Sequence, residues 1–249
     1  MPQNHNHPLQ LLLRQFELHS MLGEPARQAI LDLPVQLKTL EAGSYLVREG
    51  DRPTTCGVLV SGYAYRQKET SDGLRQIVSL HIPGEALDLQ QLYLAVADHS
   101  VQMLTRGQVA VIEQSHIRRL LAANAEVSNA VFTAVLVEGS IFREWVLNVG
   151  RRDARTRMAH LLCEFALRME KAGLAAGDGF ELPITQEQLA DAVGLTPVHV
   201  NRTLKALEAT GLITRNKRVI AFPSWERMRD VGDFNQRYLH LDGSPRARG

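Results

Sequence analysis

The chain has 249 residues, of which 45% are hydrophobic and 22% charged, as in an ordinary globular protein. No run approaches the roughly 18 apolar residues of a membrane span, and the polar start MPQNHNHPLQ has no apolar stretch typical of a signal peptide. The only two cysteines, Cys56 and Cys163, exclude a four-cysteine zinc or iron–sulfur site within one chain. These features predict a cytoplasmic protein.

The net charge of +1 is divided unevenly along the chain. Residues 151–249 hold 16 Lys/Arg and 12 Asp/Glu, whereas residues 1–150 hold 12 and 15. A basic C-terminal part suits an anionic partner such as nucleic acid, although an asymmetry of a few charges is common in any protein.

The first 115 residues predict helices followed by a small β domain. Apolar residues at helical spacing indicate helices within 9–33, with Pro25 near a helix start. Over 35–111, short β-rich runs such as GVLV and QIVSLHI alternate with turn sequences, which is typical of a small barrel or roll. Ser71-Asp72-Gly73 predicts a hairpin turn, because glycine tolerates positive φ.

A helical period returns at about His116 and predicts one long helix over 116–150. Its apolar stripe has two possible partners, a second copy of the chain or the chain's own β domain. The residues expected in a dimer interface are Val127, Val131, Ala134, Ile141 and Trp145.

Residues 151–235 predict a winged helix-turn-helix. Thr185 and Gln188 form a capping box, which starts a helix that Gly194 can end. Thr196 then caps a second helix with Pro197 at its first position, where a missing N–H costs nothing. The following segment GLITRNKRVIAF predicts a two-stranded wing.

The outward face of the second helix carries groups that suit DNA. Arg202 can donate two hydrogen bonds to guanine, and Val198 is placed to contact a thymine methyl group. The wing cations suit the phosphate backbone. The alternative is a helical hairpin with a solvated polar face. The expected DNA-binding residues are Thr185, Gln186, Thr196, Pro197, Val198, His199, Asn201, Arg202, Lys205, Arg215, Lys217 and Arg218.

A β-roll, a long helix and a winged helix-turn-helix in this order resemble the Crp/Fnr family of bacterial transcription regulators. The resemblance covers about residues 20–235, and its most specific part is ITQEQLADAVGLTPVHVNRTLKALEATGLI. It implies an α+β fold and a homodimer that is joined through the long helix and binds palindromic DNA, with RNA polymerase as a further partner. Many members carry Glu where this chain has Val198, so the family's half-site does not transfer.

The resemblance also assigns functions to segments of the chain. It implies an effector-type β-roll, similar to a cyclic-nucleotide-binding jelly roll, within 1–115, a dimerisation helix over 116–150 and a DNA-binding domain over 151–235. Residues 236–249 are expected to form a disordered tail.

The effector question rests on a short stretch of the roll. Family members that bind cyclic nucleotides use a Gly-Glu pair, and then an Arg followed by Ser or Thr. The corresponding positions here hold Asp88-Leu89 and His99-Ser100, and Gly84-Glu85 resembles the preceding turn. An aspartate beside a buried phosphate would repel it, so we expect no cAMP binding. The roll holds another small molecule or none, and its candidate pocket residues are Glu85, Asp88, His99 and Ser100.

Other chemistries find little support in the sequence. Nine histidines leave haem open, but His81 fits a turn, and His160 with Cys163 makes at most half a metal site. The motifs H-E-x-x-H, G-x-S-x-G and G-x-x-x-x-G-K-[ST] are absent, so we predict no enzyme and no metal site. The second hypothesis is a small-molecule sensor whose winged helix binds protein. The effector, the operator, the regulated genes and the sign of regulation stay open.

Overall fold

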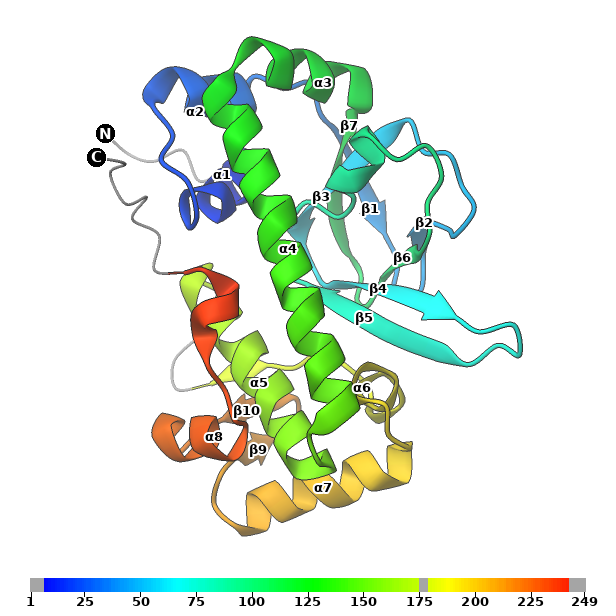
Figure 1. The fold of residues 1–249 in the computed structure, drawn as a ribbon, viewed down its shortest axis with the longest axis vertical. Coiled ribbons are helices and arrows are strands. Elements are labelled where there is room, and N and C mark those ends of the chain that lie inside the picture. Colours follow the sequence, from blue (N-terminus) through cyan, green and yellow to red (C-terminus); the bar gives the residue numbers. More distant parts are fainter. Residues whose placement is uncertain (1–6, 175–178, 242–249) are drawn as a thin grey trace. The chain divides into compact units, whose positions relative to one another are not determined.

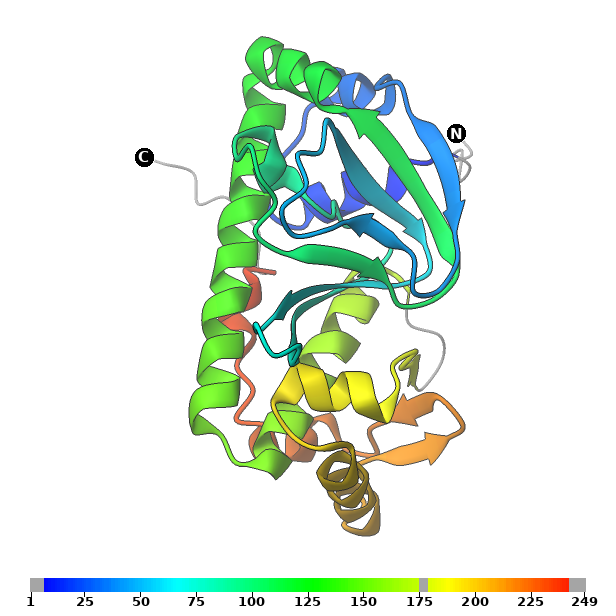
Figure 2. The same ribbon diagram turned by 90° about the vertical axis from the view of Figure 1, so that its right-hand side faces the viewer.

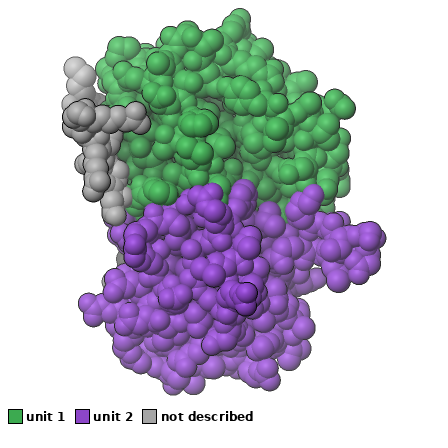
Figure 3. Space-filling view, in the orientation of Figure 1, with its two compact units in different colours: residues 1–67, 80–139, 240–249 green, residues 68–79, 140–239 purple. Residues whose placement is uncertain are grey.

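The computed structural model describes residues 7–174 and 179–241. The described residues fall into two compact units, which Figure 3 colours separately. One unit holds those within 1–67, 80–139 and 240–249, and the other holds those within 68–79 and 140–239.

Three short helices belong to the first unit. They are α1 (Gln10–Glu17), α2 (Glu24–Leu31) and α3 (Gln114–Ala123). Pro25 lies in the first turn of α2, as predicted, because that turn has no intrahelical use for the missing N–H.

Two sheets form the β-roll (Figure 2). One has the strand order β1-β7-β3 and the other β2-β6-β4-β5. The strands are β1 (Gln36–Leu40), β2 (Tyr45–Val47), β3 (Thr55–Ser61), β4 (Ala64–Glu69), β5 (Arg75–His81), β6 (Ser100–Met103) and β7 (Gly107–Glu113). The predicted turn at Ser71-Asp72-Gly73 joins β4 to β5, and Gly73 has a φ of +85°.

Strand β7 is apolar on both faces because it separates two cores. Val109 and Val111 pack into the core of the roll with Leu59 and Met103. Ala110 and Ile112 point to the opposite face, where they pack with residues of α1, α2 and the helices that follow the roll. This arrangement explains why the strand lacks a polar alternation.

The long helix α4 (Ala125–Arg151) has 27 residues and is drawn in green in Figure 1. The single helix expected over 116–150 is in fact two, because Asn124 leaves the helical conformation with φ −136° and ψ 105°. Asn124 Oδ1 accepts a hydrogen bond from the Val127 N–H at 3.0 Å, which caps the start of α4. The chain bends by 119° between α3 and α4.

The second unit contains the helix-turn-helix. Its helices are α5 (Ala154–Lys171), α6 (Gln186–Val193), α7 (Pro197–Ala209) and α8 (Trp225–Val231), with a 3-10 turn, η2, at Gln236–Leu239. Its strands β8 (Phe180–Glu181), β9 (Thr214–Asn216) and β10 (Val219–Ala221) form one sheet in the order β8-β10-β9.

A continuous run of aromatic rings holds the second unit together. Successive ring centroids lie 5.6 to 6.1 Å apart, mostly tilted or edge-to-face, which is a favourable aromatic geometry. The rings are those of Phe165, Phe180, Phe222, Trp225, Phe234 and Tyr238.

The C-terminal segment departs from the expectation of a disordered tail. Residues Gln236–Leu239 form η2, and Leu239 is buried with 2% of its surface exposed. The Tyr238 hydroxyl donates a hydrogen bond to Glu164 at 2.8 Å, so this segment is anchored to α5. Residues 242–249 of the expected tail lie outside the described residues.

Among the described residues, no single helix has the length and apolar content of a membrane span. Only α3 and α4 taken together, across their bend, reach that composition.

Candidate nucleic-acid interface

The helix-turn-helix forms at the residues whose caps predicted it. The Thr185 hydroxyl accepts from the Gln188 N–H at 3.1 Å, and the Gln188 side chain accepts from the Thr185 N–H at 3.0 Å, which completes the capping box. Gly194 ends α6 with a left-handed φ of +64°. The Thr196 hydroxyl accepts from the His199 N–H at 3.3 Å and starts α7.

The inward face of α7 fixes which side chains face out. Val200 and Leu204 are 0% and 4% exposed, and Ala190 and Val193 of α6 are 2% and 0% exposed. Since these four side chains pack the two helices together, α7 cannot rotate about its own axis without exposing them to water.

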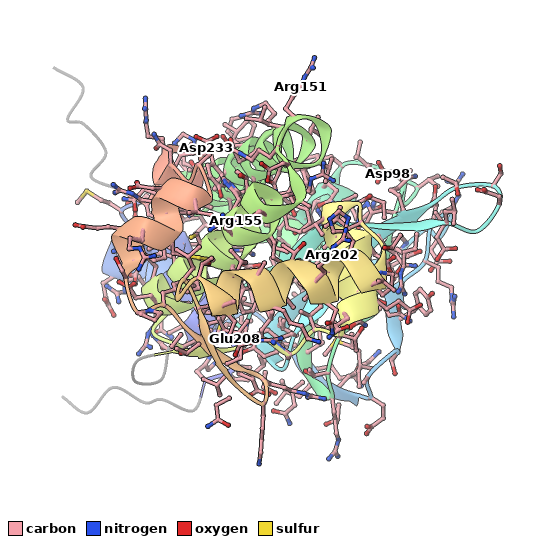
Figure 4. The ribbon with its side chains drawn as sticks, turned by 90° about the horizontal axis from the view of Figure 1, so that it is seen from below. Asp98, Arg151, Arg155, Arg202, Glu208 and Asp233 are labelled. Carbon is pink, nitrogen blue, oxygen red and sulfur yellow. The ribbon has the colours of Figure 1, made fainter. Side chains whose placement is uncertain are left out.

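The opposite face of α7 is open to solvent. Val198 is 79% exposed, and Pro197 and Lys205 are exposed on the same helix. Arg202, which is labelled in Figure 4, is exposed as well. His199 is only half-buried and flanks this row.

The ends of α6 and the turn supply polar groups to the same motif. Thr185, Gln186 and Thr196 are exposed. Asn201 is half-buried, and its Nδ2 donates to Gln186 Oε1 at 3.2 Å, which links α7 to the first turn of α6.

The wing is a tight hairpin of β9 and β10. Lys217 at its tip has a φ of +55°, and both Lys217 and Arg218 are exposed. Arg215 differs from them, because its Nη2 lies 2.7 Å from Glu208 Oε2 of α7. The Arg215 charge is therefore partly neutralised in the free chain.

Sequence reasoning did not single out two further exposed arginines. Arg151 ends α4 and Arg155 lies in the first turn of α5, and both are visible in the view that looks onto α7 (Figure 4). The basic sequence Arg151-Arg152-Asp153-Ala154-Arg155 was the available signal.

A buried carboxylate anchors α5, the helix behind the motif. Glu164 is 1% exposed and accepts hydrogen bonds from Trp145 Nε1 at 3.1 Å and from the Tyr238 hydroxyl at 2.8 Å. Arg168 Nη1, at 3.2 Å, balances its charge. Because a buried carboxylate without partners is strongly destabilising, this cluster fixes the positions of three chain segments.

Most of the residues expected at a dimer seam lie inside their own chain. Val127 and Val131 are 2% and 6% exposed and belong to the core formed with α1, α2 and β7. Trp145 is 7% exposed and bonded to Glu164. Ala134 packs at the edge of the same core as Val127, and Ile141 is half-buried.

A different stripe of α4 is open to solvent. Phe132, Leu136 and Val146 are 64%, 55% and 69% exposed. They lie on a row at positions 132, 136, 139, 143, 146 and 150, which are spaced alternately by four and three residues. That spacing is typical of a coiled-coil seam.

The candidate effector residues divide into separate contacts. Asp88 is 1% exposed, and its Oδ1 lies 3.3 Å from His99 Nε2. Asp98 Oδ1 lies 2.6 Å from the other ring nitrogen of His99. His99 is therefore held between two carboxylates.

Glu85 and Ser100 serve other partners. Glu85 Oε2 lies 3.2 Å from His81 Nδ1, and Ser100 Oγ accepts from the Glu49 N–H at 3.0 Å. Sequence reasoning missed Arg66, which is 2% exposed. Its guanidinium donates to the Leu87 carbonyl at 2.8 Å and pairs with Glu138 of α4 at 2.6 Å.

The cysteines are not poised for redox or metal chemistry. Both Cys56 and Cys163 are buried, and burial raises the pKa of each thiol to about 12. Within the described ranges 7–174 and 179–241, no three His, Cys, Asp or Glu side chains gather in a way that could hold a metal ion.

Comparison with known proteins matches both parts of the chain. The family model described as the Crp-like helix-turn-helix domain matches residues 156–231, and the model of the cyclic nucleotide-binding domain matches residues 37–124. The chain belongs to the Crp/Fnr family.

Named Crp/Fnr relatives and a solved structure cover most of the chain. It is 28% identical to the transcriptional activator protein FnrL of Cereibacter sphaeroides, over 79% of this chain and 80% of the relative. It is 26% identical to the nitrogen fixation regulation protein FixK of Rhizobium meliloti, over 80% and 88%. The structure of FixK2 from Bradyrhizobium japonicum has the same fold, with a TM-score of 0.73 and 22% identity over 80% of this chain and 98% of that one.

These matches and the geometry agree on the general function. The chain is a Crp/Fnr-type DNA-binding transcription regulator, with a cyclic-nucleotide-binding-like β-roll and a helix-turn-helix.

Buried His81 predicts that the stability of the roll depends on pH. Burial lowers the pKa of His81 below 6.5, despite the Glu85 carboxylate that raises it. The folded state then binds a proton less readily than the unfolded state, so the free energy of unfolding should fall as pH drops from about 7 to about 5. Denaturant unfolding across this range should show a shallower loss for His81→Gln than for the wild type. His116→Gln, a half-buried histidine on α3, is the control, and an equal effect of both variants would contradict the assignment.

Proposed function

We propose that this regulator acts in the cytoplasm as a homodimer that reads a near-palindromic DNA site with α7. The observation that carries the proposal is the exposed row of Val198 and Arg202 on a helix that is capped at Thr196 and locked by its buried face. RNA polymerase is the partner expected from the family, and we propose no enzymatic activity.

Direct base reading fits the chemistry of this row. Val198 and Arg202 are four residues apart on α7, so their side chains are neighbours on one face. A valine supplies apolar contact to a thymine methyl group, and an arginine donates two hydrogen bonds to guanine O6 and N7. Arg202 is exposed and takes part in no ion pair with the described residues, so its guanidinium need not leave a carboxylate to bind DNA.

Phosphate contacts would surround the reading helix. Lys205, Lys217 and Arg218 are exposed cations, and Thr185, Gln186 and Thr196 offer hydroxyl and amide groups. Arg151 and Arg155 add two further exposed cations. In this proposal three residues make weaker contacts with DNA. They are the half-buried His199 and Asn201, and Arg215, which is paired with Glu208.

The dimer that we propose uses the exposed stripe of α4. Phe132, Leu136 and Val146 would pack against the same residues of a second copy, as in a two-stranded coiled coil. This replaces the seam expected from the sequence, because Val127, Val131 and Trp145 are already buried in their own chain.

We also propose that the roll does not bind cAMP. A phosphate bound there would need a cation, but His99 lies between Asp88 and Asp98, and both of its ring nitrogens already face carboxylates. The buried Asp88 carboxylate would repel the phosphate, since two negative charges in a low-dielectric site interact strongly.

The reading role of α7 predicts two different mutant phenotypes. Arg202→Ala should cost about 1–3 kcal/mol per half-site and relax the preference at one base pair, because the variant cannot form the bidentate hydrogen bonds to guanine. Lys217→Ala should weaken all sequences alike and reduce the slope of log K against log salt by about one unit for each phosphate that the lysine neutralises. Selection of bound DNA from a random library, followed by salt titration of the binding constant, measures both effects.

The two variants control for one another once thermal melting has shown that both fold. If the DNA sequence preference is unchanged in Arg202→Ala but altered in Lys217→Ala, the wing and not α7 reads the bases. Binding to DNA without a steep salt dependence would favour a protein-interaction role for the winged helix instead.

The proposed seam predicts a monomer on charge insertion. Leu136→Glu would place a carboxylate in the centre of the coiled coil without a partner, so sedimentation should show monomers. Leu74→Glu makes the same change at a leucine that is 67% exposed on the β4–β5 hairpin and should leave the dimer intact. A dimer that persists in Leu136→Glu would place the interface elsewhere.

Calorimetry tests the effector proposal. Titration of the full chain with cAMP should give no heat of binding at tens of micromolar ligand, roughly the range of a −6 kcal/mol interaction. A one-to-one isotherm would contradict the proposal that the roll does not bind cAMP.

A further inference from the structure

The turn of the helix-turn-helix begins at the C-terminal end of α6, where the last carbonyls lack hydrogen-bond donors within the helix. The last carbonyls of an α-helix have no N–H four residues further along the same helix. In α6, the N–H groups of Gly194 and Leu195 both turn back to the Ala190 carbonyl. The carbonyls from Asp191 to Gly194 therefore need donors from other segments or from water.

Two side chains from distant segments supply these donors. Gln76 Nε2, on β5, donates to the carbonyl of Asp191 at 2.6 Å and lies 3.4 Å from that of Ala192. Arg157 Nη1, on α5, donates to the carbonyl of Val193 at 2.7 Å and lies 3.3 Å from that of Gly194. A donor from the hairpin and a cation from α5 thus complete the end of α6, where the helix dipole also favours positive charge.

An ion pair reinforces the contact made by Gln76. Arg75 Nε and Nη2 lie 2.7 and 2.5 Å from Asp191 Oδ2. The two side chains are 26% and 22% exposed, so water screens the pair only in part. Residues 68–79 belong to the same compact unit as 140–239, which places the tip of the β4–β5 hairpin with the helix-turn-helix.

We propose that Arg75 and Gln76 are positioning residues of the helix-turn-helix formed by α6 and α7. By fixing the end of α6 they fix the turn at Gly194, and the turn sets the direction in which α7 presents its outward face. The proposal rests on the proposed function, because it assigns to these two residues the preorganisation of α7 for DNA. The contacts that carry the proposal are made with Asp191 and Ala192 of α6.

The two residues that hold the end of α6 lie on the hairpin formed by β4 and β5. β4 and β5 continue from the tip into the four-stranded sheet of the roll, whose order is β2-β6-β4-β5. Without the contacts of Arg75 and Gln76 with α6, α7 would be less ordered before it binds DNA. Binding would then cost additional ordering of the chain, so DNA affinity depends on these contacts.

A charge-reversal cycle tests the ion pair in the full-length protein. Arg75→Asp and Asp191→Arg each put like charges together, and the double variant restores an opposite pair. In the DNA-free protein, hydrogen exchange of the α6 and turn amides should speed up in each single variant and return toward the wild-type rate in the double variant. DNA affinity should fall by about 3- to 10-fold in Arg75→Asp and recover in the double variant, as for a partly exposed ion pair.

Two controls separate positioning from charge and from folding. Arg119→Asp reverses an exposed arginine on α3 and measures how much a change of net charge alone lowers DNA affinity. Gln76→Met removes the amide donor without changing charge, and should also accelerate exchange at the α6 end. It remains informative if a charge reversal prevents folding.

The outcomes that overturn the proposal are specific. Unchanged exchange in Gln76→Met, no recovery in the double variant, or a rise in DNA affinity in Arg75→Asp would each do so. A wild-type chain that binds no DNA would instead refute the proposed function, while the exchange measurements would still decide whether the hairpin holds α6.

Discussion

The buried carboxylate of Glu164 is the constraint on which the second unit depends. Water cannot reach it, so its charge must be met by protein donors, and these come from Trp145, Arg168 and Tyr238. The three donors lie before, within and after the helix that carries Glu164. Satisfying one carboxylate therefore fixes the end of α4, the whole of α5 and the segment beyond α8, and the helix-turn-helix is built on that frame.

The long helix α4 illustrates how one element serves two surfaces. Its Val127 and Val131 complete the core beside the roll, whereas Phe132 and Leu136 lie on a different face of the helix and are exposed to solvent. A helix that is apolar on more than one face either is buried all round or has a second partner. The exposed fractions favour the second case, and the coiled-coil spacing of the outer stripe is consistent with a twin helix as that partner.

The sequence predicted best what local signals determine. Thr185, Gly194, Thr196 and Pro197 act within a few residues of themselves, so the two helices and their turn could be placed from the sequence alone. The break at Asn124 was missed because asparagine is also tolerated inside helices. Val127, Val131 and Trp145 were predicted at a dimer seam but are buried in their own chain, because a periodic stripe does not tell which face meets the chain's own core. Tyr238 was assigned to a tail because its partner, Glu164, is 74 residues away.

The anchoring of Tyr238 decides where the DNA-binding part of this chain can be cut. The matched helix-turn-helix model ends at Val231, before Phe234 and Tyr238. A fragment that stopped there would leave Glu164 short of one donor and the aromatic run short of two rings. A fragment that keeps these contacts of Glu164 must extend through Leu239 and begin before Trp145, within the helix that we propose for dimerisation. It would still lack the contacts that Arg75 and Gln76 make with Asp191. Any fragment that keeps the helix-turn-helix and its Glu164 cluster therefore also contains part of the helix that we propose for dimerisation.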